Sequence, residues 1–218
     1  MDRPSTPRTT VRQKPQRGHY DRQTIMAILA EGLVCHVAFV ADGAPVVIPT
    51  GYAVDGDRVL LHGGVASRLL GVLGEGAEVS IAVTLVDGIV LADAAFRHSM
   101  NYRSVVLFGR ATPITDPDLK ILAMRAFTEH IVPGRWDDLP PPTTQEINAT
   151  AVVEVPIDEV SAKVRTGPPI AGPVLPKEGL WRGVANFATT VAGYTAVDDS
   201  VTEVPAYLRA YRRPFTRR

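Results

Sequence analysis

Residues 98–110 read His-Ser-Met-Asn-Tyr-Arg-Ser-Val-Val-Leu-Phe-Gly-Arg, and this stretch is the most informative about the fold. Hydrogen-bonding side chains crowd its first part, and an apolar run from Val105 to Phe108 follows. A strand with one solvent-facing side alternates polar and apolar residues more evenly than this. The pattern therefore indicates a buried strand that holds a polar, anionic ligand at the mouth of a barrel.

A second polar cluster, His-Gly-Gly-Val-Ala-Ser-Arg at residues 62–68, lies upstream. Glycines let a backbone approach a ligand closely, and Ser67 is placed to start a helix whose free N–H groups favour a phosphate. Arg68 would add a charged fork. The alternative interpretation is an ordinary serine-capped helix.

Arg103 in the first cluster also has two interpretations. An arginine inside a β-run must be neutralised, because an unpaired buried charge is costly. An internal salt bridge to Asp87 or Asp93 would do this, and so would a phosphate shared with Arg68. The two clusters together favour the shared phosphate, so Arg68 and Arg103 are expected to converge.

Composition limits the classes of protein. The 218 residues are 45% apolar and 21% charged, with a formal net charge of zero, which is typical of one soluble globular domain. Neutrality argues against a nucleic-acid partner, and no run approaches the ~18 apolar residues of a membrane span. A single cysteine, Cys35, and no apolar signal core predict a cytoplasmic protein without disulfides.

Three segments are expected along the chain. Residues 1–18 are rich in arginine and proline and predict a flexible basic arm. Residues 19–166 form the folded domain. Residues 167–218 form a Pro/Gly-rich extension that packs on the barrel or on a partner subunit and ends in a basic tail (Arg212, Arg213, Arg217 and Arg218).

Within the domain the signals are mainly β. Asp-Gly pairs at 42–43, 55–56 and 87–88 predict tight turns between apolar runs. The strands are expected at 33–40, 45–53, 58–62, 78–86, 89–92, 102–114 and 150–155. Short helices are expected after Asp21, at 67–73, after Asp116-Pro117 and after Thr143. Gly32 would end the first of them. Hairpin-linked strands with few helices predict a mainly β, antiparallel barrel with flanking helices.

The chain from Leu33 to Thr115 resembles the pyridoxamine 5′-phosphate oxidase-like, FMN-binding split-barrel superfamily, which is an antiparallel Greek-key fold. The resemblance rests on Val47-Ile48-Pro49-Thr50, on His62 through Arg68, and on Asn101-Tyr102-Arg103-Ser104-Val105 followed by Phe108-Gly109. The last run is the most specific of the three.

The resemblance implies a site for FMN at the junction of a homodimer. The backbone of Val47, Ile48, Pro49 and Thr50 would lie along the flavin ring. His62 and Gly63 would border the ribityl chain, and Ser67 and Arg68 would hold the phosphate. Further contacts would come from Asn101, Tyr102, Arg103 and Ser104.

Departures from the true oxidases disfavour oxidation of vitamin B6. The family's arginine in the first ligand strand is absent from Val47-Ile48-Pro49, Leu69 stands where a lysine would follow Arg68, and the Arg-Leu-x-Pro tail is missing. The chain is more similar to the nitroimidazole-resistance-like branch, which shares the histidine before the Gly-rich turn and the Tyr-Arg-Ser-Val strand. That branch implies flavin-dependent reduction of a small organic molecule.

The flavin would carry the redox chemistry, so the protein needs at most a proton donor. His62 is the candidate acid or base, unless it only hydrogen-bonds the cofactor. Lys163 and Arg165 alternate along a strand and either approach the cofactor pocket or protect a sheet edge. We therefore expect an FMN-dependent oxidoreductase. The alternatives are a non-catalytic carrier of flavin, deazaflavin or haem and, less favoured, pyridoxamine phosphate oxidase itself.

Overall fold

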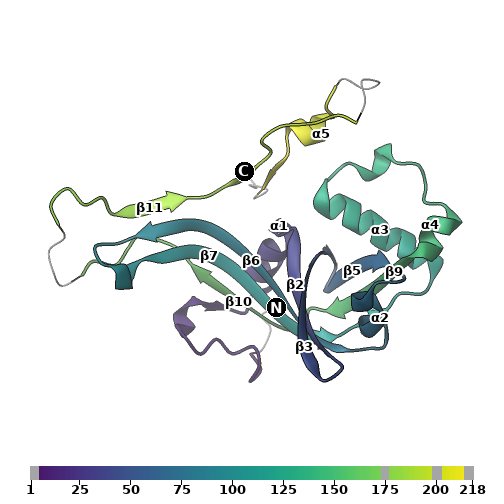
Figure 1. The fold of residues 1–218 in the computed structure, drawn as a ribbon, viewed down its shortest axis with the longest axis horizontal. Helices are drawn as coiled ribbons and strands as arrows, with labels where there is room; N and C mark the ends of the chain where they lie inside the picture. Colours follow the sequence, from purple (N-terminus) through teal and green to yellow (C-terminus); the bar gives the residue numbers. More distant parts are fainter. Residues whose placement is uncertain (1–4, 173–176, 198–202, 214–218) are drawn as a thin grey trace.

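A computed structural model of the chain describes residues 5–172, 177–197 and 203–213. Arg3, Arg217 and Arg218 of the predicted basic ends lie outside these residues. Two antiparallel sheets and a few short helices form a split barrel, which confirms the predicted fold class. Figure 1 shows the long, curved strands of the larger sheet beside the smaller sheet and its helices.

The larger sheet has the strand order β1-β10-β7-β6-β2-β3, with β11 added against β6. The smaller sheet has the order β4-β5-β9-β8. The strands of the larger sheet are β1 (Gly18–His19), β2 (Val34–Ala41), β3 (Ala44–Gly51), β6 (Glu78–Leu91), β7 (Ser99–Arg110), β10 (Glu159–Arg165) and β11 (Gly183–Asn186). Those of the smaller sheet are β4 (Ala53–Asp55), β5 (Arg58–Gly64), β8 (Thr112–Pro113) and β9 (Thr150–Pro156).

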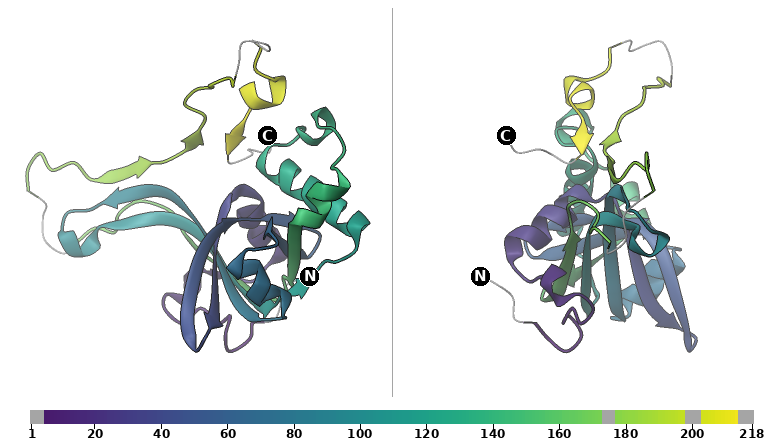
Figure 2. Two further views of the ribbon diagram at one scale, coloured as in Figure 1. Left: turned by 45° about the vertical axis from the view of Figure 1, so that its right-hand side comes forward. Right: turned by 90° about the vertical axis from the view of Figure 1, so that its left-hand side faces the viewer.

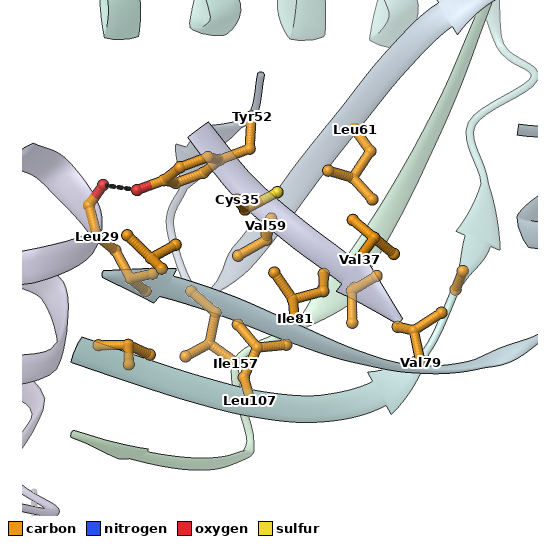
Figure 3. Close-up of a cluster of buried hydrophobic side chains, with 14 of the residues drawn as sticks. Leu29, Cys35, Val37, Tyr52, Val59, Leu61, Val79, Ile81, Leu107 and Ile157 are labelled. Carbon is orange, nitrogen blue, oxygen red and sulfur yellow. Dashed lines mark hydrogen bonds between the residues drawn. The ribbon is translucent and has the colours of Figure 1, made fainter. Parts of the chain in front are cut away.

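The core fills the space between the two sheets and is closed at one end by helix α1 (Arg22–Glu31) (Figure 3). Alternate side chains of the strands point inward, as in β2, where Cys35 and Val37 are buried. Tyr52 is fully buried, and its hydroxyl donates a hydrogen bond to the carbonyl of Leu29 at 2.6 Å. This bond joins the end of α1 to the turn between the sheets.

Helix α1 begins and ends as predicted, although Gly32 ends it for an unexpected reason. The Asp21 carboxylate caps the helix by accepting from the Thr24 N–H at 2.7 Å. Gly32 has a φ of −67°, so no left-handed conformation is needed. A Cβ at this position would lie 2.5 Å from the Tyr52 hydroxyl and 2.6 Å from Val83. Glycine is therefore required by close packing.

Two of the three predicted Asp-Gly turns form. Asp42 and Gly43 have φ of 52° and 74°, which makes a type I′ turn between β2 and β3. The prediction that Asp87-Gly88 ends a strand is wrong. Strand β6 continues to Leu91 with a register shift between Val86 and Gly88. Strand β7 pairs with β6 on both sides of this point, and β11 pairs with residues 88–91, so the extra residue is absorbed as a bulge.

Helix α3 (Pro117–Ile131) forms the predicted apolar face, yet only part of that face is buried. Ala123 and Phe127 pack into a second cluster with β4, β5 and β9, whereas Leu119 and Leu122 remain exposed. The Thr143–Glu146 capping box is confirmed and starts α4 (Thr144–Ala149). Helix α2 (Arg68–Gly74) joins β5 to β6.

The two ends of the described chain lie against the barrel. In the predicted N-terminal arm, Thr9 is buried, and Arg8 forms ion pairs with Glu78 and Glu159. In the extension, β11 pairs with β6, and Tyr207 in α5 (Ala206–Arg209) donates to the Asp138 carboxylate at 2.6 Å. A short ribbon of β12 (Thr189–Thr190) and β13 (Arg212–Arg213) lies between them (Figure 2).

Helices of the described residues are all too short or too polar to cross a membrane.

Candidate functional site

The predicted flavin-ring strand, β3, is an edge strand whose outer side pairs with no other described strand. The two-residue turn makes Ala41 and Ala44 a hydrogen-bonded pair, and pairs alternate from there. Residues 45, 47, 49 and 51 therefore direct their backbone polar groups outward. Because Pro45 and Pro49 lack an N–H, the donors on this edge are Val47 and Gly51.

This arrangement suits a small planar ligand better than another strand. Proline at alternate positions removes donors that a pairing strand would need, which is how edge strands resist addition. A single N–H at Val47 remains between outward carbonyls of residues 45 and 47. The edge thus presents an alternation of acceptor and donor over the length of one heterocycle.

The cluster at residues 62–68 lies beside the same hairpin. The Arg68 side chain is 63% exposed, and its only ion pair among the described residues is a 3.5 Å contact with the exposed Asp42 at the β2–β3 turn. A Cβ at Gly64 would meet no atom within 4 Å, and one at Gly63 would make ordinary contacts. The backbone here is therefore open to a ligand. Most N–H donors of the Arg68 guanidinium make no hydrogen bond to a described residue.

Ser67 is already used for local structure. Its hydroxyl accepts from the Leu70 N–H at 3.4 Å and so caps α2, which has seven residues. The serine-capped helix anticipated as the alternative is what forms. Arg68 is therefore the stronger phosphate candidate of the two.

His62, the predicted acid or base, lies on β5 with an exposed side chain. Its ring packs against Phe127 with the centroids 3.9 Å apart, and no described residue hydrogen-bonds its nitrogens. Removal of water by this packing lowers the pKa of His62 below its ordinary value. The ring is consequently neutral at pH 7, with a nitrogen lone pair available to a proton or a metal.

Arg103 has the internal partners that the sequence left open as an alternative. Its guanidinium donates to Asp87 at 2.7 and 2.9 Å and to both carboxylate oxygens of Glu31, one of them at 2.7 Å. These carboxylates raise the pKa of Arg103, so the charge is permanent. The pairing lies at the end of the barrel that α1 closes.

The structure does not bring Arg68 and Arg103 together within one chain. Arg103 is held by Glu31, three residues before β2, whereas Arg68 lies at Asp42, directly after β2. Eight residues of strand span roughly 25 Å. The expectation that both arginines of one chain hold a single phosphate is therefore wrong for the isolated chain.

Other polar residues of the first cluster, at 98–110, are also occupied by protein contacts. The Ser104 hydroxyl donates to the Lys163 carbonyl at 3.3 Å, and the buried Asn101 accepts from Arg165 and donates to the Gly167 carbonyl at 3.2 Å. Tyr102 faces Arg165 across the β7–β10 ladder. Arg165, which the sequence placed either near the cofactor pocket or at a protected sheet edge, is a buried cation. No local signal separates it from an exposed arginine.

Among the described residues, no group of three His, Cys, Asp or Glu side chains is arranged to bind a metal ion. Cys35 is buried, and burial raises the pKa of its thiol to about 12, so it is no nucleophile at neutral pH.

An antiparallel split barrel with an open, polar edge strand beside an exposed arginine is typical of flavin-binding split-barrel proteins. Residues 21–164 match the family model described as pyridoxamine 5′-phosphate oxidase. The chain belongs to this family, as the sequence motifs predicted. No curated protein matched the chain.

Solved structures give two similarities that extend over nearly the whole chain. The flavocytochrome Anf3 from Azotobacter vinelandii is 35% identical, with a TM-score of 0.84 over 96% of this chain and 99% of that one. The FAD and heme binding protein from Mycobacterium smegmatis is 33% identical, with a TM-score of 0.82 over 90% and 97%. The extension after residue 167 is thus part of a shared architecture.

The fold is also similar to that of a solved protein named for nitroimidazole resistance. A candidate 5-nitroimidazole antibiotic resistance protein from Bacteroides thetaiotaomicron is 24% identical, with a TM-score of 0.57 over 67% of this chain and 86% of that one. This similarity shows a common fold.

Proposed function

We propose that this chain is a flavin-dependent redox protein that holds the flavin ring along the outer edge of β3, with the flavin phosphate at Arg68. The outward Val47 N–H between two outward carbonyls carries this proposal. The pyrimidine edge of a flavin presents a ring N–H between two carbonyl oxygens. Its N–H can donate to an outward carbonyl of residue 45 or 47 while a neighbouring flavin carbonyl accepts from the Val47 N–H. The flavin supplies the electron transfer when bound, and the protein orients it and excludes water.

The chain is proposed to act as a homodimer, with a second copy covering the outer face of the larger sheet. On that face of β2, Val34, His36 and Val40 are exposed, while the opposite face lines the core. Apart from His36, the face is apolar. Val47 continues the same face onto β3. The edge that would receive the flavin ring therefore borders the proposed subunit contact.

The flavin phosphate is common to FMN and FAD. FMN is the smaller cofactor that the motifs predict, and the two more similar solved structures are of proteins named for FAD with heme or as a flavocytochrome. Chromatography of the cofactor released from the denatured protein separates the two flavins.

The experiment begins with the absorption spectrum of the purified protein. A two-banded flavin spectrum that a reduced nicotinamide bleaches and a nitroaromatic compound restores supports a reductase. Arg68→Gln is expected to weaken flavin retention roughly tenfold or more, since a charged hydrogen bond contributes about 1.5–3 kcal/mol. Arg110→Gln is the matched control, because Arg110 is an exposed arginine that donates to the carbonyl of Gly76. A colourless chain that takes up neither FMN nor FAD contradicts the proposal.

A second candidate function, electron transfer through a bound haem, rests on His62. Its neutral ring with unpaired nitrogens has the chemistry of an axial haem ligand. A Soret band in the purified protein that His62→Ala abolishes, with the flavin retained, supports this role. A flavin spectrum without a Soret band, even after the protein is incubated with haem, excludes it and leaves His62 as the candidate proton donor.

A further inference from the structure

Arg165 is a buried cation surrounded by neutral partners. The residue is 7% exposed, and its guanidinium donates to the Asn101 side-chain oxygen and, at 3.4 Å, to the carbonyl of Gly167. No carboxylate of the described residues lies within ion-pair distance. A guanidinium carries five N–H donors and a full charge, so these two acceptors leave it incompletely satisfied.

Two other partly buried arginines of the barrel are neutralised by carboxylates. Arg103 lies between Glu31 and Asp87, and Arg58 lies between Asp55 and Glu154. Arg165 is buried more deeply than either, yet it has no such partner among the described residues. Burial lowers the pKa of Arg165, which is the direction expected for a charge that the protein itself does not compensate.

Two further cations lie beside Arg165. Arg17 ends a 3-10 helix directly before β1, and its positive charge also lowers the pKa of Arg165. Lys163 projects from the same face of β10 two residues earlier and pairs in register with Gly18. Neither side chain has an ion pair with a described residue. Positive charge therefore accumulates at this end of the sheet without a counterion among the described residues.

We propose that Arg165 and Arg17 form a binding site for a phosphate group, with Asn101 orienting the Arg165 guanidinium. Two adjacent guanidinium groups match the charge and the several acceptor oxygens of one phosphate. Three strands, β7, β6 and β2, separate β10 from the flavin edge at β3. The site is thus distinct, within one chain, from the proposed flavin edge. Its phosphate belongs either to a nucleotide cofactor, such as one that reaches over from a second copy, or to a phosphorylated substrate.

The test uses the full-length protein and titrates inorganic phosphate and pyrophosphate by calorimetry at constant ionic strength. We expect binding by the wild type, a rise in Kd of about tenfold in Arg165→Met and about threefold in Arg17→Gln, since charged hydrogen bonds to phosphate are strong. Arg12→Gln is the matched control, because Arg12 is an exposed arginine of the same N-terminal segment. Its Kd should stay within about twofold of the wild type.

Cofactor retention distinguishes the two sources of phosphate. If a resident flavin nucleotide supplies the group, free phosphate binds poorly to the wild type, and both variants are purified with less flavin than Arg12→Gln. If a substrate supplies it, the flavin content is unchanged and only the Kd rises. A chain that binds no flavin would contradict the proposed function, and the phosphate titration would still decide this inference.

Unfolding without added anion separates binding from a structural role. Removal of an uncompensated buried charge should leave the midpoint of Arg165→Met unchanged or higher. Arg17→Gln, at a half-buried position, serves if Arg165→Met fails to fold. The inference is overturned if neither the phosphate Kd nor the flavin content of these variants differs from that of Arg12→Gln.

Discussion

Arg103 and Arg165 show how little a residue's sequence context says about its charge environment. Each is an arginine in a β-run with polar neighbours. Arg103 emerges on the face of β7 that α1 covers, where Glu31 and Asp87 neutralise it. Arg165 emerges beside the neutral Asn101. Cations that the protein itself pairs are structural, and those that it buries unpaired are the better candidates for ligand binding.

Replacement of Arg103 tests its structural role. Arg103→Met leaves Glu31 and Asp87 as neighbouring like charges in a partly buried site, so we expect a loss of about 2–4 kcal/mol in the free energy of unfolding. Arg103→Lys keeps the charge without the fork and should lose less. Urea denaturation measures both. If Arg103→Met keeps its stability and loses flavin, the phosphate contact predicted from the sequence is supported instead.

Among the elements, strand β6 shows that the same dipeptide can be a turn or a bulge. Asp42-Gly43 turns the chain because its strands can pair only with each other there. Strand β7 pairs with β6 on both sides of Asp87-Gly88, and β11 pairs with β6 from Gly88 onward. The carbonyl of Asp87 also accepts the Phe187 N–H at 2.9 Å. The neighbouring strands decide which outcome is realised.

Gly88 is expected to control the docking of β11. A Cβ at this position would lie 2.6 Å from the Ala185 carbonyl oxygen, so Gly88→Ala should push β11 away from β6. We expect faster limited proteolysis within residues 177–197, with barrel stability changed by less than about 1 kcal/mol. Gly193→Ala is the control, because a Cβ there meets no atom within 4 Å. Equal cleavage rates in the two variants would show that β11 docks by other contacts.

At the scale of the whole molecule, the larger sheet has one face in the core and one outer face. The described N-terminal residues cover part of the outer face near Phe108, whereas no described segment covers it at β2 and β3. The outer face carries Val40 and Val47, which are 65% and 60% exposed. The extension leaves this surface open, because it runs along β6 at the opposite end and returns to the loop near Asp138 (Figure 2). An apolar sheet face of this kind is typical of a subunit contact.

Sedimentation analysis tests the proposed homodimer. Val40→Lys places a charge on the outer face near the β2–β3 turn, so we expect a shift of the wild-type dimer towards monomer, with loss of flavin. Val197→Lys, at a fully exposed valine of the extension, should leave the dimer intact. A wild-type chain that sediments as a monomer at every concentration refutes the subunit contact.

The sequence by itself determined the features that depend on near neighbours in the chain. The caps at Asp21, Asp116 and Thr143 and the turn at Asp42-Gly43 are all local, because each rests on hydrogen bonds within a few residues. The family was predicted from three other short stretches, residues 47–50, 62–68 and 101–109.

Tertiary structure alone decided which charges meet. It gave Arg103 its two carboxylates, left Arg165 without one among the described residues, and set Arg68 at the far end of β2 from Arg103. It also turned Asp87-Gly88 into a bulge. Ion partners and strand register join residues that are distant in the chain, so they depend on the packing of the whole barrel, which no short stretch encodes.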